Sequence, residues 1–414
     1  MTKNMQTRKK PDQESRYKLS GITWAIVFAG LAPGLALADA ADSFNFAAGI
    51  SARYEDNLFR LADSAPTPNG ASAKSDTLFT TYAGIRFDRT YDLQRIQLDV
   101  TATSYNYRNN DYLNFTALDY RAAWLWAISP RLTGSLFADK TSQVTSYTNL
   151  QNISTSNQRT VENQGLLGDW LVDGGWHLTG GAYRLRSKTD STELTSFGNF
   201  VQDTAEAGVK YVSTANNSLA LVQRQARGEY IDRAINPVSK LDNRYDQSDT
   251  ELRAIYQVTG HSRLDTRIGY RDRTYENYSE RDFSGAVGAI SYLWTPTGKL
   301  QFTLTAGRDL LAYQENNNSY YASNFVNFTP AWLISDKTTL RLKLDWYKNK
   351  FEGAVVPVSE LREDKIYSTQ LALAWRPTRT VVVDSFLLHE ERSSNISRLP
   401  YKANVVGLSA SAVF

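Results

Sequence analysis

The sequence offers few side chains of the kinds that catalysis or metal binding requires. Its three histidines, His177, His261 and His389, are widely separated, and it contains no cysteine. His389 is followed by Glu390-Glu391-Arg392 and lacks the second histidine of a zinc-protease helix. No phosphate-binding loop, G-x-S-x-G turn or G-x-G-x-x-G motif occurs. These absences predict a protein that is not an enzyme and uses neither metal nor cofactor. The alternative is an active centre assembled from separate strands, which would leave no motif in the sequence.

Charged side chains are instead arranged in alternation with apolar ones. Within residues 263–271 and 340–346, charged residues alternate with apolar or aromatic ones, and residues 44–54 alternate in the same way with weaker polarity. Successive side chains of a β-strand point to opposite faces, so each segment predicts a strand with one apolar and one polar face. Beyond the first 40 residues, no segment has the period of an amphipathic helix.

The charged faces are the candidates for function. Against lipid, an Arg or Lys would cost roughly 2–4 kcal/mol near the bilayer midplane, so we expect these residues to line the inside of a barrel. They could hydrate and stiffen the wall through ion pairs, or they could form a sugar path in which charged groups hydrogen-bond hydroxyls and aromatic rings stack on pyranoses. The candidate lumen or sugar-path residues are Arg53, Asp99, Asp119, Arg121, Glu206, Lys210, Glu251, Arg253, Asp265, Arg267, Arg271, Arg341, Lys343 and Asp345.

Short turns recur at intervals of about 37 to 45 residues, and longer polar connections alternate with them. The longer connections are expected at 55–75, 147–162, 189–199, 232–246 and 352–364. This alternation is typical of outer-membrane barrels, and it predicts an all-β fold: a transmembrane antiparallel β-barrel of about 18 strands (16 to 18) with both of its ends in the periplasm. The short turns are expected near Tyr91-Asp92, Ser129-Pro130, Asp173-Gly174, Ala215-Asn216, Gly260-His261, Pro296-Thr297, Asp336-Lys337 and Pro377-Thr378.

Aromatic residues gather near the predicted strand ends. Tryptophans lie close to the short turns, and tyrosines such as Tyr107, Tyr147 and Tyr275 lie near the long loops. Amphipathic rings prefer the headgroup level of a bilayer, so both sets are expected to form girdles that face lipid; ordinary packing within a sheet is the alternative. The tryptophans assigned to the girdle are Trp126, Trp176, Trp294, Trp332 and Trp375.

The two ends of the chain carry export and assembly signals. Basic residues from Lys3 to Lys18, an apolar stretch from Ile22 to Leu37 and small residues around Ala38 are typical of a secretory signal peptide. We therefore expect a signal peptide at 1–38, cleaved near 38/39 or 40/41, and a barrel at 39–414 in the outer membrane of a Gram-negative bacterium. An N-terminal membrane anchor is the alternative. Phe414 ends an alternating segment and resembles the signal that the barrel-assembly machinery recognises.

Two other classes of protein fit the sequence poorly. A nucleic-acid partner requires clustered basic residues, whereas the net charge is only +3 and evenly spread. A soluble β-propeller also repeats at about 40 to 50 residues, but each of its blades holds four short strands. Each repeat here holds two long ones, which favours the barrel.

Motifs at the strand ends are more specific than a generic barrel requires. With them the chain resembles the EpsL family, outer-membrane barrels encoded in exopolysaccharide operons associated with exosortase systems. The resemblance implies a part in exopolysaccharide biosynthesis, as an export channel or secretion component for the polymer, and it carries over no catalytic or binding residue. The motifs include Tyr54-Glu55-Asp56-Asn57-Leu58-Phe59-Arg60, Ala123-Trp124-Leu125-Trp126, Tyr292-Leu293-Trp294-Thr295-Pro296-Thr297-Gly298-Lys299-Leu300 and Pro330-Ala331-Trp332.

Two further functions stay open at this point: a general or sugar-selective diffusion porin, and a plugged structural barrel that docks partner proteins. The expected surroundings are outer-membrane lipid and lipopolysaccharide. The expected partners are the exopolysaccharide, periplasmic export machinery and the barrel-assembly machinery. The sequence leaves open the polymer, the direction and gating of transport, and the oligomeric state.

Overall fold

The computed structural model describes residues 43–149, 155–156, 158–315, 318–355 and 360–414. The expected signal peptide and both of its cleavage positions lie outside these residues. The described residues form eighteen strands: β1 (Phe44–Glu55), β2 (Asp76–Tyr91), β3 (Gln94–Tyr107), β4 (Phe115–Ser129), β5 (Leu132–Val144), β6 (Gln158–Asp173), β7 (Trp176–Thr189), β8 (Phe200–Val212), β9 (Ser218–Tyr230), β10 (Arg244–Thr259), β11 (Ser262–Tyr275), β12 (Phe283–Thr297), β13 (Leu300–Glu315), β14 (Asn318–Ser335), β15 (Thr338–Glu352), β16 (Glu363–Trp375), β17 (Val381–Ser394) and β18 (Tyr401–Val413).

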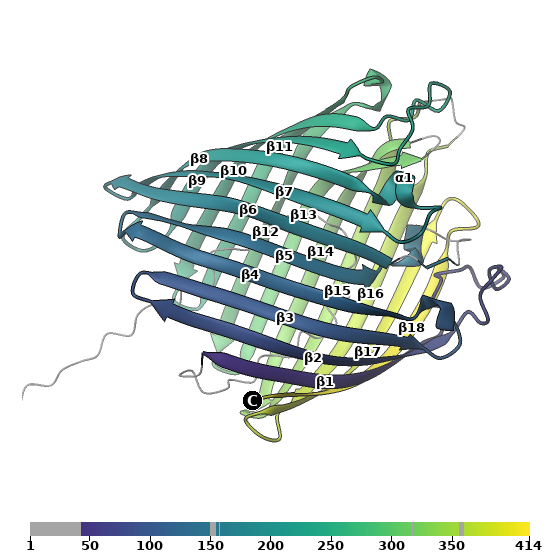
Figure 1. Ribbon diagram of the computed structural model, residues 1–414, viewed down its shortest axis with the longest axis horizontal. Coiled ribbons are helices and arrows are strands. Elements are labelled where there is room, and N and C mark those ends of the chain that lie inside the picture. The colour runs from purple at the N-terminus through teal and green to yellow at the C-terminus, as the bar shows by residue number, and fades with distance from the viewer. Residues whose placement is uncertain (1–42, 150–154, 157, 316–317, 356–359) are drawn as a thin grey trace, which may run out of the picture. The chain divides into compact units, whose positions relative to one another are not determined.

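The strands close into one antiparallel barrel (Figure 1). Each strand pairs with its neighbours in sequence, and β1 pairs with both β2 and β18, so that Ile50 lies opposite Thr81 on one side and Ala410 on the other. Closure gives every strand a partner on both sides and removes the exposed edges that a lipid environment would penalise. The predicted barrel of about 18 strands is confirmed.

Short turns gather at one end of the barrel and the long loops at the other, although there β13 ends at Glu315 and β14 already begins at Asn318 (Figure 1). All eight connections at the turn end lie at the predicted turns. In one of them, Gly174 and Gly175 both have positive φ, which glycine adopts without strain. The predicted long loops also lie at one end, although β6 begins at Gln158 and β10 at Arg244, so the expected loops at 147–162 and 232–246 run into the strands that follow.

The outer wall is apolar over most of its surface, as alternation predicts. Phe46, Ile50, Leu387 and Leu408 are each more than half exposed, while their sequence neighbours face the interior. Within the described part of the chain, no helix has the length and apolar composition needed to cross a bilayer. The short helical turns α1 (Thr195–Gly198), η1 (Asp111–Leu113), η2 (Tyr147–Asn149) and η3 (Ser279–Arg281) all lie in the loops.

Tyrosines near the long loops form the interior packing instead of a second lipid-facing girdle. Tyr107 and Tyr147 pack with Phe59 and Leu113, and both tyrosines are almost completely buried. Tyr275 belongs to a second cluster with Tyr245, Phe283, Val287, Leu310 and Ala322. The prediction that these three tyrosines face lipid is therefore wrong, because the loops fold over the barrel mouth and bury the inward-facing rings.

Candidate functional site in the barrel interior

The interior of the barrel receives the charged residues that the sequence singles out. Arg53, Asp99, Asp119, Arg121, Glu206, Lys210, Glu251, Arg253, Asp265, Arg267, Arg271, Arg341, Lys343 and Asp345 all occupy the inward positions of their strands, opposite in phase to the exposed apolar side chains. They do not converge on one point. They form several groups around the wall, and none of these groups of described residues brings together three His, Asp or Glu side chains as a metal site would.

The densest group surrounds Glu251 on β10. Its Oε2 accepts hydrogen bonds from Nε and Nη2 of Arg253 at 2.9 and 2.7 Å, and its Oε1 lies 3.4 Å from Nη1 of Arg267 and 3.5 Å from Nη1 of Arg224. Glu206 on β8 approaches the same Arg224 at 3.3 Å. Glu251 is almost completely buried, so its charge is offset by guanidinium groups and not by water.

A second group continues the first toward the loops. Arg271 on β11 donates from Nε to Asp249 at 2.8 Å and from Nη1 to Asp309 at 2.9 Å. Its Nη1 also donates to the backbone carbonyl of Leu310 at 2.9 Å. Acids and bases thus alternate across β8 to β13 as one ion-paired strip of the inner wall.

The remaining candidates lie in smaller and wetter pairs. Arg86 and Asp99 form a two-point ion pair across β2 and β3, with both side chains more than a third exposed. Lys343 contacts Asp345 at 2.9 Å on β15. Nearer the turns, Asp169 accepts hydrogen bonds from His177 and Lys210.

Burial of the inner wall differs between its two halves. Toward the loops, inward side chains on most sides of the barrel are buried, including Glu55, Tyr245, Asp364 and Tyr401, each under 5 % exposed, whereas those of β6 are only partly buried. From mid-barrel toward the turns, Arg121 and Arg341 are exposed to the interior, and Asp265 and Lys343 keep about 41 and 43 % of their side-chain surface. Burial extends into the turn half at a few positions, including Ser135 on β5 and Asp384 and Ser411 on β17 and β18. The interior is therefore packed at the loop end and open to solvent over much of the turn end.

One loop reaches across the barrel mouth to produce this packing. The loop between β5 and β6 carries Thr148, whose carbonyl accepts a 2.5 Å hydrogen bond from Nη1 of Arg392 at the end of β17. The Thr148 hydroxyl also lies 3.4 Å from the Tyr401 hydroxyl on β18. Its neighbour Asn149 accepts a 3.0 Å hydrogen bond from Nη2 of Arg362, in the loop before β16. These contacts join parts of the wall that are six strands apart around the ring.

The loop between β1 and β2 fills the space beside this crossing. Arg60 is buried there, contacts Glu55 on β1 and donates from Nε to Glu390 on β17 at 2.9 Å. Burial alone would lower the pKa of the Arg60 guanidinium. The nearby carboxylates of Glu55 and Glu390 have the larger combined effect, so the pKa is raised above its ordinary value. Phe59 beside it packs edge-on against Tyr147. Arg60 thus fixes the first loop to the last hairpin of the barrel.

Two further buried arginines fasten the loops on the other side. Arg281 donates to the carbonyls of Ser239 and Lys240, both in the connection between β9 and β10, and to that of Asn318 at the start of β14. Arg233 donates from Nε to the Ser196 carbonyl at 2.7 Å. Burial lowers the pKa of both guanidinium groups. Each arginine satisfies several buried carbonyls at once, so the loops form a connected cap.

Aspartates anchor two of these loops in the same way. Asp76 accepts backbone N–H hydrogen bonds from Arg108, Asn109 and Asn110 at 2.9 to 3.0 Å. Asp242 accepts them from Asn277 at 2.6 Å and from Tyr278 at 3.1 Å. In both cases a carboxylate at the start of one strand, or two residues before it, holds the loop after the next strand.

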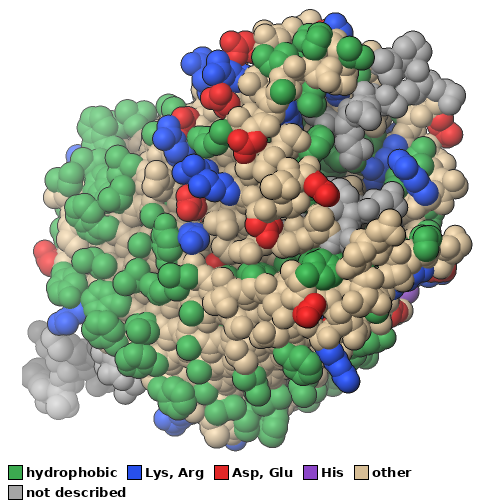
Figure 2. Space-filling view, turned by 45° about the vertical axis from the view of Figure 1, so that its right-hand side comes forward, with side chains coloured by type: hydrophobic (Ala, Val, Ile, Leu, Met, Phe, Trp, Pro, Cys, Tyr) green, Lys and Arg blue, Asp and Glu red, His purple; other side chains and the backbone are tan. Residues whose placement is uncertain are grey.

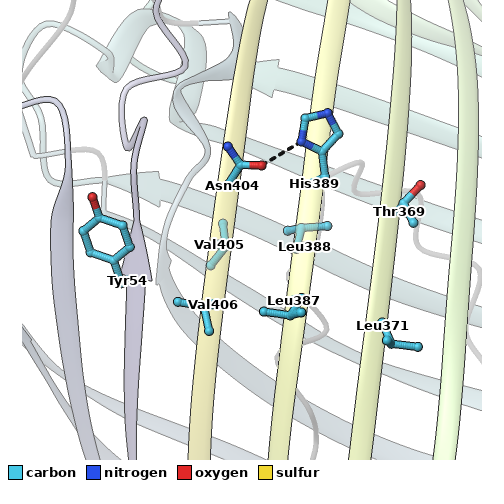
Figure 3. Close-up of a pocket in the computed structure, with 9 residues that line it drawn as sticks. All are labelled: Tyr54, Thr369, Leu371, Leu387, Leu388, His389, Asn404, Val405 and Val406. Atoms are coloured by element: carbon cyan, nitrogen blue, oxygen red, sulfur yellow. Dashed lines mark hydrogen bonds between the residues drawn. The ribbon is translucent and has the colours of Figure 1, made fainter.

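One apolar hollow lies on the outer wall and not in the interior (Figure 3). It has a volume of about 480 Å³ and is lined by Tyr54, Leu371, Leu387 and Val406, all exposed on the side that faces lipid, with His389 and Asn404 at its rim. Nδ1 of His389 lies 2.8 Å from Oδ1 of Asn404. An apolar hollow of this kind fits acyl chains, so it is not a candidate for the solute path.

Sequence reasoning missed the residues that close the loop end. Arg60, Thr148, Asn149, Arg233, Arg281, Arg362 and Arg392 act through contacts between distant parts of the chain, and Arg224 lies on a strand whose alternation is weak. The available signals were the polar residues clustered in each loop and, for Arg60, the motif from Tyr54 to Arg60. The predicted tryptophans do lie at the turn end, where Trp176, Trp294, Trp332 and Trp375 are about half exposed and Trp126 packs over Gly134.

Comparison with known proteins agrees with this architecture. Residues 250–414 match the family described as "Putative beta-barrel porin 2". The barrel is similar to the structure of Pseudomonas aeruginosa OccK2 (OpdF), with a TM-score of 0.51 and 11% identity over 90% of this chain and 97% of that one. It is equally similar to Acinetobacter baumannii OccAB3, with a TM-score of 0.51 and 9% identity over 90% and 99% of the two chains.

Pseudomonas aeruginosa OpdQ has a TM-score of 0.50 and 13% identity over 90% of this chain and 97% of that one. No curated protein matches the sequence. Identities this low establish a shared fold. A closed barrel with an apolar outer wall is the form in which β-strands cross an outer membrane. The chain is a porin-like β-barrel of the Gram-negative outer membrane.

Proposed function

We propose that this barrel is the outer-membrane conduit of an exopolysaccharide system, closed at its loop end at rest and accessible to carbohydrate from its turn end. The observation that carries the proposal is the unequal burial of the inner wall, packed toward the loops and solvated toward the turns. In barrels of this class short turns face the periplasm and long loops the cell exterior. The arrangement therefore suits export, because an open periplasmic half can receive polymer while the outer half prevents leakage.

The chemistry of the open half suits carbohydrate. Arg121, Arg341, Lys343 and the Arg86–Asp99 pair present charged donors and acceptors to the interior without a large apolar surface. Such groups exchange hydrogen bonds with sugar hydroxyls at little cost, since their ion pairs are partly hydrated. The link to exopolysaccharide comes from the EpsL-like motifs at the strand ends, one of which, Tyr54 to Arg60, includes the arginine that fixes the first loop.

Selective diffusion of small solutes is the second candidate. It is favoured by the fold shared with the Occ porins, one of which, OccK2 (OpdF), has been crystallised in complex with glucuronate. A diffusion channel for such a solute would use the strip around Glu251 and Arg267 as a filter and would conduct without a partner. A plugged barrel that docks other proteins is the third candidate, and the connected cap of loops supports it.

Two measurements on the same protein separate these functions. In a clean deletion strain, the export proposal predicts loss of secreted polymer and retention of carbohydrate in the periplasm, both restored by the intact gene. Purified barrel in a planar bilayer is expected to be closed or to flicker. A variant in which 145–157 is replaced by a short glycine-serine link, which removes the contacts of Thr148 and Asn149, should conduct steadily.

The outcomes point in different directions. Normal polymer secretion in the deletion strain overturns the export proposal. Steady conduction by the unmodified barrel, with normal secretion, supports the diffusion porin. If neither protein conducts and loop replacement leaves secretion intact, the barrel is plugged and acts by docking.

A further inference from the structure

Polar side chains on the outer wall are concentrated in one sector, although charged residues also face outward elsewhere, such as Arg308 on β13 and Lys402 on β18. On β7 to β10 the outward positions of the loop half hold charged and amide side chains, here called the polar wall patch: Arg184, Asp203, Gln223, Gln225, Arg227, Asp246, Ser248 and Thr250. Figure 2 shows acidic and basic side chains interspersed on the face toward the loops, while hydrophobic side chains gather toward the turns.

The patch is built from cross-strand pairs that stay exposed. Arg184 on β7 contacts Asp203 on β8 at 2.6 Å, with both side chains 55% exposed. Arg227 on β9 contacts Asp246 on β10 at 3.0 Å. Between and below them, the Gln223 amide donates to Ser248 at 2.8 Å and accepts from the Thr250 hydroxyl at 2.6 Å. The patch is thus an ordered polar surface.

The patch extends deep along the strands. Gln223 is the sixth of the 13 residues of β9, and Thr250 the seventh of the 16 residues of β10, so the patch extends to mid-strand. On β18, which lies nine strands away in either direction around the ring, the corresponding mid-strand positions are Val406 and Leu408, 46 and 59% exposed. Lipid at the depth of Leu408 would therefore meet the polar side chains of Gln223 and Thr250 on the opposite wall, where such groups are costly to expose.

The order of positive and negative charges along the patch distinguishes between a lipid and a protein as the molecule that contacts it. Arg184, Asp203, Arg227 and Asp246 alternate in sign from β7 to β10, with two charges of each kind. A phosphate-bearing lipid would select a basic surface, which this is not. A two-fold axis along the membrane normal between β8 and β9 would place Asp203 of each copy against Arg227 of the other, because such an axis exchanges the two strands.

We infer that the polar wall patch is the contact surface for a second copy of this chain. The small outward side chains Ala182, Ala205 and Ala207 lie beside it and allow two walls to approach closely. The amides of Gln223 and Gln225 lie next to the proposed axis, so they face polar groups of the other copy and not acyl chains. This inference is independent of what passes through the barrel.

The absence of cysteine from the chain permits a direct test. Gln225→Cys places one thiol beside the proposed axis, and Leu408→Cys places a similarly exposed thiol on the opposite wall as a matched control. After mild oxidation of intact outer membranes, we expect a disulfide-linked dimer for Gln225→Cys and at least tenfold less for Leu408→Cys. Equal cross-linking of the two variants, or none in either, overturns the inference.

Charge reversal tests the geometry of the pairing. In the Gln225→Cys background, Asp203→Arg and Arg227→Asp should each reduce the dimer several-fold, and the double variant should restore it. Heat-modifiable migration of each variant on a denaturing gel establishes that the barrel is folded. Failure of the double variant to restore a dimer lost in both folded single variants overturns the two-fold arrangement. If Gln225→Cys instead captures a different protein or co-purifies with lipopolysaccharide and forms no dimer, the second copy is ruled out.

Discussion

Nη1 of Arg392 donates a 2.5 Å hydrogen bond to the carbonyl of Thr148, a residue 244 positions earlier in the chain. The same guanidinium donates from Nε and Nη2 to the Leu399 carbonyl at 2.8 and 2.5 Å, so one buried cation joins the β5–β6 loop to the β17–β18 hairpin. The bond to Thr148 crosses the barrel mouth, and the two bonds to Leu399 stay within the β17–β18 hairpin. The contact holds the crossing loop in place, because Thr148 leads directly into that loop.

Replacing Arg392 should therefore open the loop end. Hydrogen bonds to charged groups contribute roughly 1.5–3 kcal/mol each, so Arg392→Ala is expected to raise the population of open loops by about tenfold or more. The readout is single-channel conductance in planar bilayers, together with sensitivity of cells to a large antibiotic that the outer membrane normally excludes. Arg398→Ala, in the same loop at an exposed position, serves as the control. Equal conductance of the two variants would show that Arg392 does not hold the mouth closed.

Removing the charge of Glu251 should change the ionic selectivity of the interior. Glu251 lies within 3.5 Å of Arg224, Arg253 and Arg267, and Glu251→Gln leaves these three guanidiniums with one carboxylate fewer. We expect a shift toward anions, measured as the reversal potential across a salt gradient in a loop-opened barrel. Loss of a buried ion-pair partner also costs roughly 3–5 kcal/mol, so folding is checked by heat-modifiable migration.

Glu229→Gln is the matched control for that experiment. Glu229 pairs with Arg244 at 3.0 Å, but both side chains lie outside the barrel and are about half exposed. Its neutralisation should leave the reversal potential unchanged. An unchanged potential for Glu251→Gln as well would mean that ions do not pass this strip.

The barrel itself was predictable because its physical requirements repeat along the chain. Each strand must place an apolar side chain outward at every second position, and each hairpin needs a turn, so the pattern recurs often enough to count strands and locate all eight turns. The inward position of Arg267 or Asp345 follows from the same parity. Nothing in that reasoning depends on contacts between distant residues.

The closed loop end was not predictable for the opposite reason. Arg60 meets Glu390 across 330 residues, and such a contact leaves no periodic trace in the sequence. The weak alternation of 218–231 has a specific cause: Gln223, Gln225 and Arg227 face outward, where lipid-facing strands carry apolar residues. The strand signal is weak in this segment because the segment contributes to the polar wall patch.

Acid should release the loop that Asp242 anchors. Burial alone would raise the pKa of this carboxyl. Hydrogen bonds from Asn277, Arg244 and Tyr278 have the larger combined effect and hold the pKa below the ordinary 3.8. A carboxyl whose pKa is lower in the folded than in the unfolded state stabilises the fold when the pH is above the ordinary pKa. This contribution weakens as the pH falls from the ordinary pKa through the folded-state pKa. A spin label at Glu276→Cys should thus keep the same mobility from pH 7 to 5 and become mobile only below about pH 3.8.

Asp242→Asn provides the comparison, because it keeps the shape of the side chain and removes the charge. The label at residue 276 is then expected to be mobile at every pH. A label at Ser393→Cys, on the end of β17 away from Asp242, controls for general unfolding in acid. Acid mobility at both labelled sites together would assign the change to the whole barrel and not to Asp242.

Removing the ring of Phe414 should reduce assembly of the barrel into the outer membrane far more than it reduces the stability of the folded barrel. The residue follows β18, its backbone exchanges hydrogen bonds of 2.8 and 2.9 Å with Phe46, and its ring is 66% exposed, so it contributes little packing to the folded barrel. If the ring is instead read by the assembly machinery, the Phe414→Ala barrel should fall several-fold in outer-membrane amount while purified protein refolds into detergent with an unchanged midpoint in urea. Phe44→Ala, a similarly exposed ring at the start of β1, should reach the membrane normally. A matching drop for both variants would show that Phe414 acts as an ordinary lipid-facing ring and not as a signal.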